Sequence, residues 1–230
     1  NYSIAARTEG NRNVGITAKE KYTRDAEILE KALEDDPENH RYQFYLAQSY
    51  FDSQQWDKSK EAYQKRVGQG GWNEEAFYSQ YRVAIICAVQ KESDELIQME
   101  FLKAYNIRPV RAEPLIEISR LNRMNGRAAA AYIFAKRAVE IEFPKDDILF
   151  IAEDVYKYVA LDELGATAFF AGKPHEGYTA CKILLEENRL PQEHIQRVQN
   201  NFDEYTKVLS KIYENDQPKK KTYKKRKNNK

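Results

Sequence analysis

Apolar residues recur along this chain at helical intervals, and alternating runs of β-branched residues that would form strands are absent. In 22–33 the apolar positions are spaced by three and four residues, which places them on one face of a helix. The same spacing appears in 42–50 and, after a turn at 54–55, again in 56–63. The pattern therefore predicts an all-α protein whose helices each bury one apolar face.

Prolines end several of these helical runs. Pro37, Pro109 and Pro144 each follow such a run and stop it, because proline removes a backbone donor and clashes with the preceding turn. Ala104 and Ala138, small residues at equivalent points of two helices, are 34 residues apart. A period of about 34 residues with paired helices is the pattern of tetratricopeptide repeats.

The chain divides into repeats of nearly constant phase. A half repeat at 22–39 precedes full repeats near 40–73, 78–111, 112–145 and 158–191, and a capping helix at 192–214 closes the stack. Gly126 and Gly172 fall in turns inside two repeats, where glycine adopts a positive φ most easily. Because one repeat alone leaves a face bare, we expect a tetratricopeptide-like right-handed superhelix of antiparallel helix pairs.

Two insertions interrupt the period, at 74–77 and at 146–157. We expect the second to lengthen a helix from Asp146 and Asp147 onward. Residues 1–21 are expected to form a linker, and 215–230 a basic disordered tail. The chain begins with Asn1 and not with Met, so we expect that it was cut from a longer protein.

The formal net charge of +1 conceals an uneven distribution. The segment 217–230 holds eight of the 37 Lys and Arg residues, so the rest of the chain has 29 basic against 36 acidic residues. The tail is interpreted as a solvated end, with nuclear import or a polyanion contact as alternatives. An acidic body disfavours nucleic acid as a partner. No apolar run approaches 18 residues, so no membrane span is expected.

The sequence offers no catalytic, metal or cofactor site. His40, His175 and His194 are scattered without metal-ligand spacing. The glycines of 68–71 lack the lysine and the preceding strand of a phosphate loop, and they are interpreted as a turn. The two cysteines, Cys87 and Cys181, lie in apolar surroundings and are expected to be buried. They form no disulfide framework, which favours a reducing, cytoplasmic location.

Tetratricopeptide arrays bind through a groove lined by the first helix of each repeat, and resemblance to them indicates which positions face it. Phe44, Gln48, Val83, Glu113 and Glu117 occupy positions where chaperone-binding repeats carry Lys, Asn and Arg, which disfavours that function. Arginines suit carboxylate or phosphate, so an anionic partner is expected. In the alternative, they pair with Glu113, Glu117 and Asp162 on neighbouring helices. The expected groove residues are Arg41, Phe44, Gln48, Arg82, Ile86, Arg120 and Arg123.

Some stretches are more specific than the repeat pattern requires: RYQFYLAQSY (41–50), QKRVGQGGWNEE (64–75) and RPVRAEPL (108–115). They resemble the C-terminal tetratricopeptide-like helical region of family 2 (GT-A type) glycosyltransferases. The resemblance implies a non-catalytic scaffold that supports the catalytic domain in cis or holds acceptor or partner. The family's Asp-x-Asp motif is absent from the chain, so no catalytic residue carries over. The alternative is a free-standing interaction module that binds a protein or peptide in its concave groove.

Overall fold

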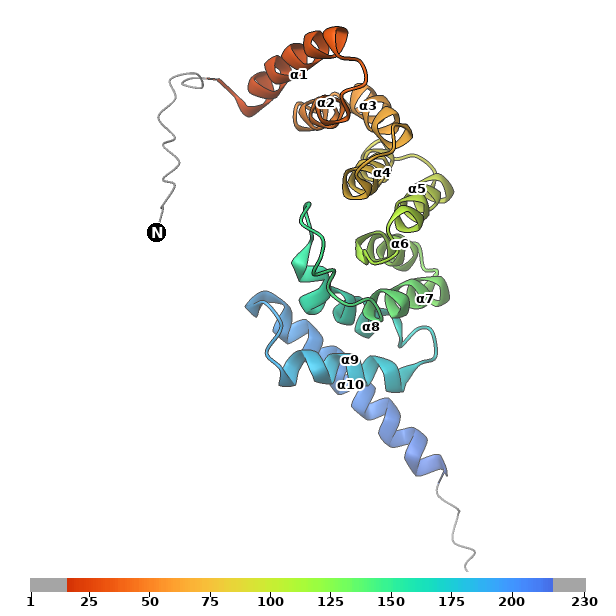
Figure 1. The fold of residues 1–230 in the computed structure, drawn as a ribbon. Helices are drawn as coiled ribbons and strands as arrows, with labels where there is room; N and C mark the ends of the chain where they lie inside the picture. The colour runs from red at the N-terminus through yellow and green to blue at the C-terminus, as the bar shows by residue number, and fades with distance from the viewer. Residues whose placement is uncertain (1–15, 217–230) are drawn as a thin grey trace, which may run out of the picture.

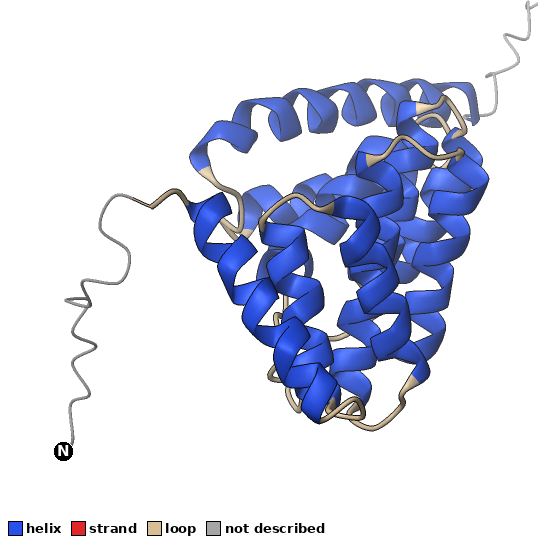
Figure 2. Cartoon of the chain, turned by 90° about the horizontal axis from the view of Figure 1, so that it is seen from above, coloured by secondary structure: helices blue, strands red, loops and turns tan. Residues whose placement is uncertain are grey.

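A computed structural model describes residues 16–216, and all regular structure within them is helical (Figures 1 and 2). Residues 1–15 of the predicted linker (1–21) and 217–230 of the predicted tail (215–230) lie outside the described residues. The helices are α1 (Ala18–Asp35), α2 (His40–Asp52), α3 (Trp56–Gly68), α4 (Asn73–Val89), α5 (Asp94–Ile107), α6 (Glu113–Met124), α7 (Ala128–Val139), the π-helical turn η2 (Val155–Val159), α8 (Ala160–Thr167), α9 (Pro174–Glu186) and α10 (Gln192–Asp216).

Side-chain caps fix where several helices begin. Thr17 and Glu20 form a reciprocal capping box at the start of α1, with the Glu20 amide donating to the Thr17 hydroxyl at 3.2 Å. Asn39 caps α2 by accepting from the Tyr42 amide at 3.0 Å. Because α1 begins at Ala18, the prediction that the linker extends to residue 21 is wrong.

The helices form antiparallel pairs that stack into an arc. Helices α2, α4, α6 and α8 line the inner, concave side, and α3, α5, α7 and α9 lie behind them (Figure 1). Each helix packs against the next one along the chain. This arrangement confirms the prediction of an all-α, tetratricopeptide-like superhelix. None of the helices in 16–216 is long and apolar enough to cross a membrane.

Small residues occupy the places where paired helices cross. Ser59 donates its hydroxyl to the Ala47 carbonyl at 2.9 Å, and Ser119 donates to the Ala131 carbonyl at 2.8 Å, all four side chains being buried. These bonds join the two helices of a pair directly. Cys87 and Cys181 are also buried, as predicted, and burial raises the pKa of the Cys181 thiol to about 12.

The capping helix α10 packs closely against α9 at Gly177, where α9 has no side chain. A Cβ at Gly177 would lie 2.1 Å from the Tyr205 ring, so only glycine leaves room for that ring. The Tyr205 hydroxyl then reaches past α9 and donates to the carbonyl of Gly165 in α8 at 2.8 Å. The close approach therefore ties α8, α9 and α10 together.

The turns inside the four pairs share one geometry. Each contains a residue with positive φ, and an amide beyond it donates to a carbonyl five residues earlier, as in a Schellman motif. Glycine fills this position only in the third and fourth pairs, where the sequence predicted it. The four residues are Gln54 (φ 63°), Lys91 (φ 56°), Gly126 (φ 72°) and Gly172 (φ 72°).

Two glycine substitutions are expected to change stability in opposite directions. Gly126→Ala should lower the free energy of unfolding by about 1–2 kcal/mol, because L residues are strained at positive φ. Gly68→Ala, at the end of α3, should raise it by about 0.5–1 kcal/mol, because alanine loses less backbone entropy. An added Cβ meets no atom within 4 Å at either site, so packing does not interfere. Denaturant unfolding measures both, and shifts of the same sign would contradict this account.

The insertion after α7 is not helical at its start. Residues 140–152 form an irregular loop that enters the concave side toward α4, and the helix resumes only at Glu153 (Figure 1). The prediction of a helix from Asp146 is therefore wrong. Asp147 is drawn instead into an ion pair with the guanidinium of Arg108, and its carboxylate lies 3.3 Å from Arg111. Both the Asp147 and Arg111 side chains are 1% exposed.

Asp147→Asn should lower the free energy of unfolding by about 3 kcal/mol, because it removes the carboxylate from a buried ion pair. The Arg108 hydrogen bond lowers the Asp147 pKa below its ordinary value of 3.8. The stabilisation is therefore complete above about pH 4 and is lost as the pH falls through the lowered folded-state pKa.

Urea unfolding across this pH range should show the difference between wild type and Asp147→Asn shrinking in acid. Asp146→Asn, at the exposed neighbouring residue, is the control and should have little effect. A constant difference at every pH would show that the Asp147 charge is not responsible.

Candidate binding groove

Two of the expected groove residues lie in the core and not on the concave surface. Phe44 is 1% exposed and packs against Tyr63 and Tyr78, and Ile86 is fully buried. Burial of such side chains contributes about 2 kcal/mol each, which draws them into the contact between successive repeats. The prediction that they face a ligand is therefore wrong.

The other expected residues of the first two repeats lie on the inner helices α2 and α4 but in separate settings. Arg41 pairs with Glu75 at 2.8 Å, while Gln48 lines a shallow hollow between α1 and α2. The Arg82 guanidinium lies 4.3 Å from the centre of the Phe51 ring and 4.9 Å from that of Tyr78. Arg82 therefore makes cation–π contacts with two aromatic rings.

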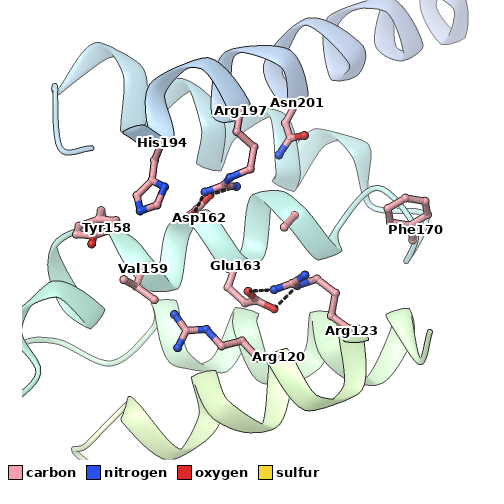
Figure 3. Close-up of a pocket in the computed structure, with 11 residues that line it drawn as sticks. Arg120, Arg123, Tyr158, Val159, Asp162, Glu163, Phe170, His194, Arg197 and Asn201 are labelled. Carbon is pink, nitrogen blue, oxygen red and sulfur yellow. Dashed lines mark hydrogen bonds and ion pairs between the residues drawn. The ribbon is translucent and has the colours of Figure 1, made fainter. Parts of the chain in front are cut away.

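Arg120 and Arg123 do come together, in a pocket of about 570 Å³ between α6, α8 and α10 (Figure 3). Three successive inner elements thus contribute to one cavity. The lining residues are Arg120, Arg123, Tyr158, Val159, Asp162, Glu163, Ala166, Phe170, His194, Arg197 and Asn201.

Two bidentate ion pairs cross this pocket, and both end on α8. Arg123 of α6 donates to Glu163 at 2.8 and 3.2 Å. Arg197 of α10 donates to Asp162 at 2.9 and 2.6 Å (Figure 3). Paired donors of a guanidinium fix both distance and orientation. The hydrogen bonds to Glu163 and Asp162 raise the pKa values of their arginines. The two pairs therefore hold α6 and α10 against α8.

Arg120 is bound less completely than these two arginines. Within residues 16–216 its one hydrogen bond joins Nη1 to the Glu117 carboxylate at 2.9 Å, and its side chain is 40% exposed. Burial raises the pKa of Glu117, and Arg120 partly opposes this shift. The remaining donors of Arg120 leave it as the arginine of this pocket that is available to an anion.

The expected alternative, that the groove arginines pair with acidic residues of neighbouring helices, describes Arg41 and Arg123, which pair with Glu75 and Glu163. Arg120 pairs instead with Glu117 of its own helix. Sequence reasoning missed Arg197 and His194, because α10 was interpreted as a cap with a solvated outer face. Their positions early in α10, before the Tyr205 anchor, place them on the helix turns that adjoin α8.

The pocket brings side chains of both charges and two aromatic rings together. The pocket combines three guanidinium groups and an imidazole with two carboxylates and the rings of Tyr158 and Phe170. Within 16–216, no three potential metal ligands lie together. A mixed-charge cavity of this kind suits a polar, extended ligand that carries an anionic group.

Matches to known proteins occur among solved structures. No family model and no curated protein matches the chain. Among solved structures, it is similar to a thermophilic TPR protein of Thermus thermophilus, with a TM-score of 0.46 and 14% identity. The match covers 83% of this chain and 91% of that one. The class of protein, a tetratricopeptide-like helical-repeat protein, is defined here by the helix pairs and their period.

Glu117→Gln should make the protein more stable at neutral pH. A raised folded-state pKa means that the carboxylate destabilises the fold as it ionises. The wild type should therefore lose stability as the pH rises from the ordinary value of 4.5 through the folded-state pKa of Glu117, and the variant should not. Urea unfolding from pH 4 to 7 measures this. Glu140→Gln, at the exposed partner of Arg137, is the matched control; equal pH dependence in all three proteins would contradict the assignment.

Proposed function

We propose that this protein is a helical-repeat interaction module that holds an extended protein or peptide segment on its concave side, with an anionic group of that segment in the pocket between α6, α8 and α10. Concave surfaces of stacked repeats are extended binding surfaces. The pocket is the region of this surface where three arginines converge.

The state of Arg120 is the observation that carries the proposal. Arg123 and Arg197 each satisfy a carboxylate of α8 with two hydrogen bonds, whereas Arg120 uses one donor on a neighbour of its own helix. A half-exposed guanidinium with free donors can bind carboxylate or phosphate in a fork geometry. Arg120 is therefore proposed to bind the ligand, whereas Arg123 and Arg197 hold the helices that form the pocket.

A finer proposal makes the module the accessory helical region of a glycosyltransferase. It rests on the resemblance of the stretches 41–50, 64–75 and 108–115, and on no comparison. In that case the concave side would hold an acceptor or contact a catalytic domain in cis. The full reading frame tests this: a nucleotide-sugar domain with Asp-x-Asp upstream supports it, and a start codon close to Asn1 supports the free-standing module.

Selection from a displayed random-peptide library, followed by fluorescence anisotropy with an enriched peptide, tests the binding function. We expect the enriched peptides to carry Asp or Glu. Arg120→Glu should weaken binding by at least about tenfold, since a close charge pair contributes about 1.4 kcal/mol or more. Glu117→Gln should strengthen binding, because it releases Arg120 from its partner.

Arg137→Glu provides the matched control. Arg137 lies on the outer helix α7 and pairs with a glutamate three residues away, as Arg120 does. It should leave the affinity unchanged. Enrichment of peptides without acidic residues, or equal losses for Arg137→Glu and Arg120→Glu, would reject the proposal.

A further inference from the structure

The loop segment 146–150 lies on the concave side in a bent, non-helical conformation, with Phe150 at a φ of 46° (Figure 1). Its backbone is not included in a helix, and groove side chains provide its main polar contacts. The Glu74 carboxylate of α4, 6% exposed, accepts from the amides of Ile148 and Leu149, both at 2.8 Å. A buried carboxylate that accepts two consecutive amides binds backbone, whatever the side chains of the segment.

Arg111 supplies donors to carbonyls of the same segment. Its guanidinium donates to the carbonyls of Leu149 at 3.2 Å and Phe150 at 3.0 Å. Glu113 holds this guanidinium at 2.7 Å, and the Phe77 ring lies 4.6 Å beneath it. The arginine is thus positioned by groove residues alone, before any contact with the segment is counted.

Side-chain contacts give the segment a sequence requirement. Asp147 pairs with Arg108 and Arg111, Leu149 packs against the core of the first repeats, and the Phe150 ring lies 4.6 Å from that of Tyr78. Ile148, between Asp147 and Leu149, is 81% exposed, so the groove does not select the residue at this position. The groove therefore holds the aspartate and the leucine closely, accepts any residue between them, and contacts one side of a phenylalanine that stays 51% exposed.

We propose that the stretch of the concave side formed by α4 and the α5–α6 junction is a binding site for Asp-x-Leu-Phe segments in a bent conformation, filled here by the chain's own residues 147–150. Because a short tether gives an effective concentration near the millimolar range, a free segment at micromolar concentration does not displace it. The site becomes available to the same motif in another molecule once the internal segment is removed. It is distinct from the arginine pocket between α6, α8 and α10.

The test supplies the segment as a separate molecule. In one variant, residues 146–150 are replaced by Gly-Ser-Gly-Ser-Gly, and the probe is a labelled synthetic peptide of residues 144–152, PKDDILFIA. We expect the peptide to bind the variant and raise its Tm, and to do neither with the wild type. The control peptide PKDNILFIA, with Asn at position 147, should bind at least about tenfold more weakly, because it lacks the charge that Arg108 and Arg111 hold.

Glu74→Gln in the loop-replaced variant tests the contribution of the groove. It should also weaken peptide binding, because Glu74 accepts the two backbone amides of the segment. If the replacement reduces helicity, the peptide should restore it, as measured by circular dichroism. Absence of binding, of a Tm increase and of restored helicity would overturn the proposal. Equal binding to wild type and variant would overturn it too, because the peptide would then bind elsewhere.

Discussion

The guanidinium of Arg111 is the buried charge on which the middle of this molecule depends. It is almost completely removed from water, and isolating such a charge costs several kcal/mol unless every donor is satisfied. Glu113 and Asp147 supply the compensating charges, and the carbonyls of the loop complete the set. The second and third repeats and the insertion are therefore fixed together, because a movement of any of them would leave a buried charge without its partner.

A second buried ion pair has the same role at the preceding junction between repeats. Arg66 of α3 binds Glu75 of α4 at 3.0 Å, and both side chains are nearly inaccessible. These residues and Arg111 lie in the stretches 64–75 and 108–115, which departed from the general repeat pattern. Their unusual sequences thus have a structural explanation in this chain, because they place charged side chains, as ion pairs, in the contacts between repeats. That explanation is independent of any resemblance to enzymes.

Periodicity was sufficient to predict the helices, because each depends on contacts a few residues apart. The glycines at 126 and 172 were also predictable, since a tight turn requires positive φ. Phe44 and Ile86 could not be assigned correctly, because the same helical position faces either the groove or the next repeat, depending on how the helices roll. The insertion was missed for a related reason. Asp147 has helix-starting character locally, but its partner Arg108 is 39 residues away.

The junction of Tyr205 with Gly177 sets the rotational phase of α10. Because the ring fits only over the bare glycine backbone, the helix has one register against α9. Arg197 lies eight residues before Tyr205 on the same helix. The contact of Tyr205 with Gly177 therefore also determines that the Arg197 side chain points toward Asp162. One residue added between them would turn Arg197 by about 100° relative to Tyr205 and carry it out of the pocket. Length changes beyond Tyr205 would leave it in place, so the far half of α10 is free to vary without altering what the pocket presents.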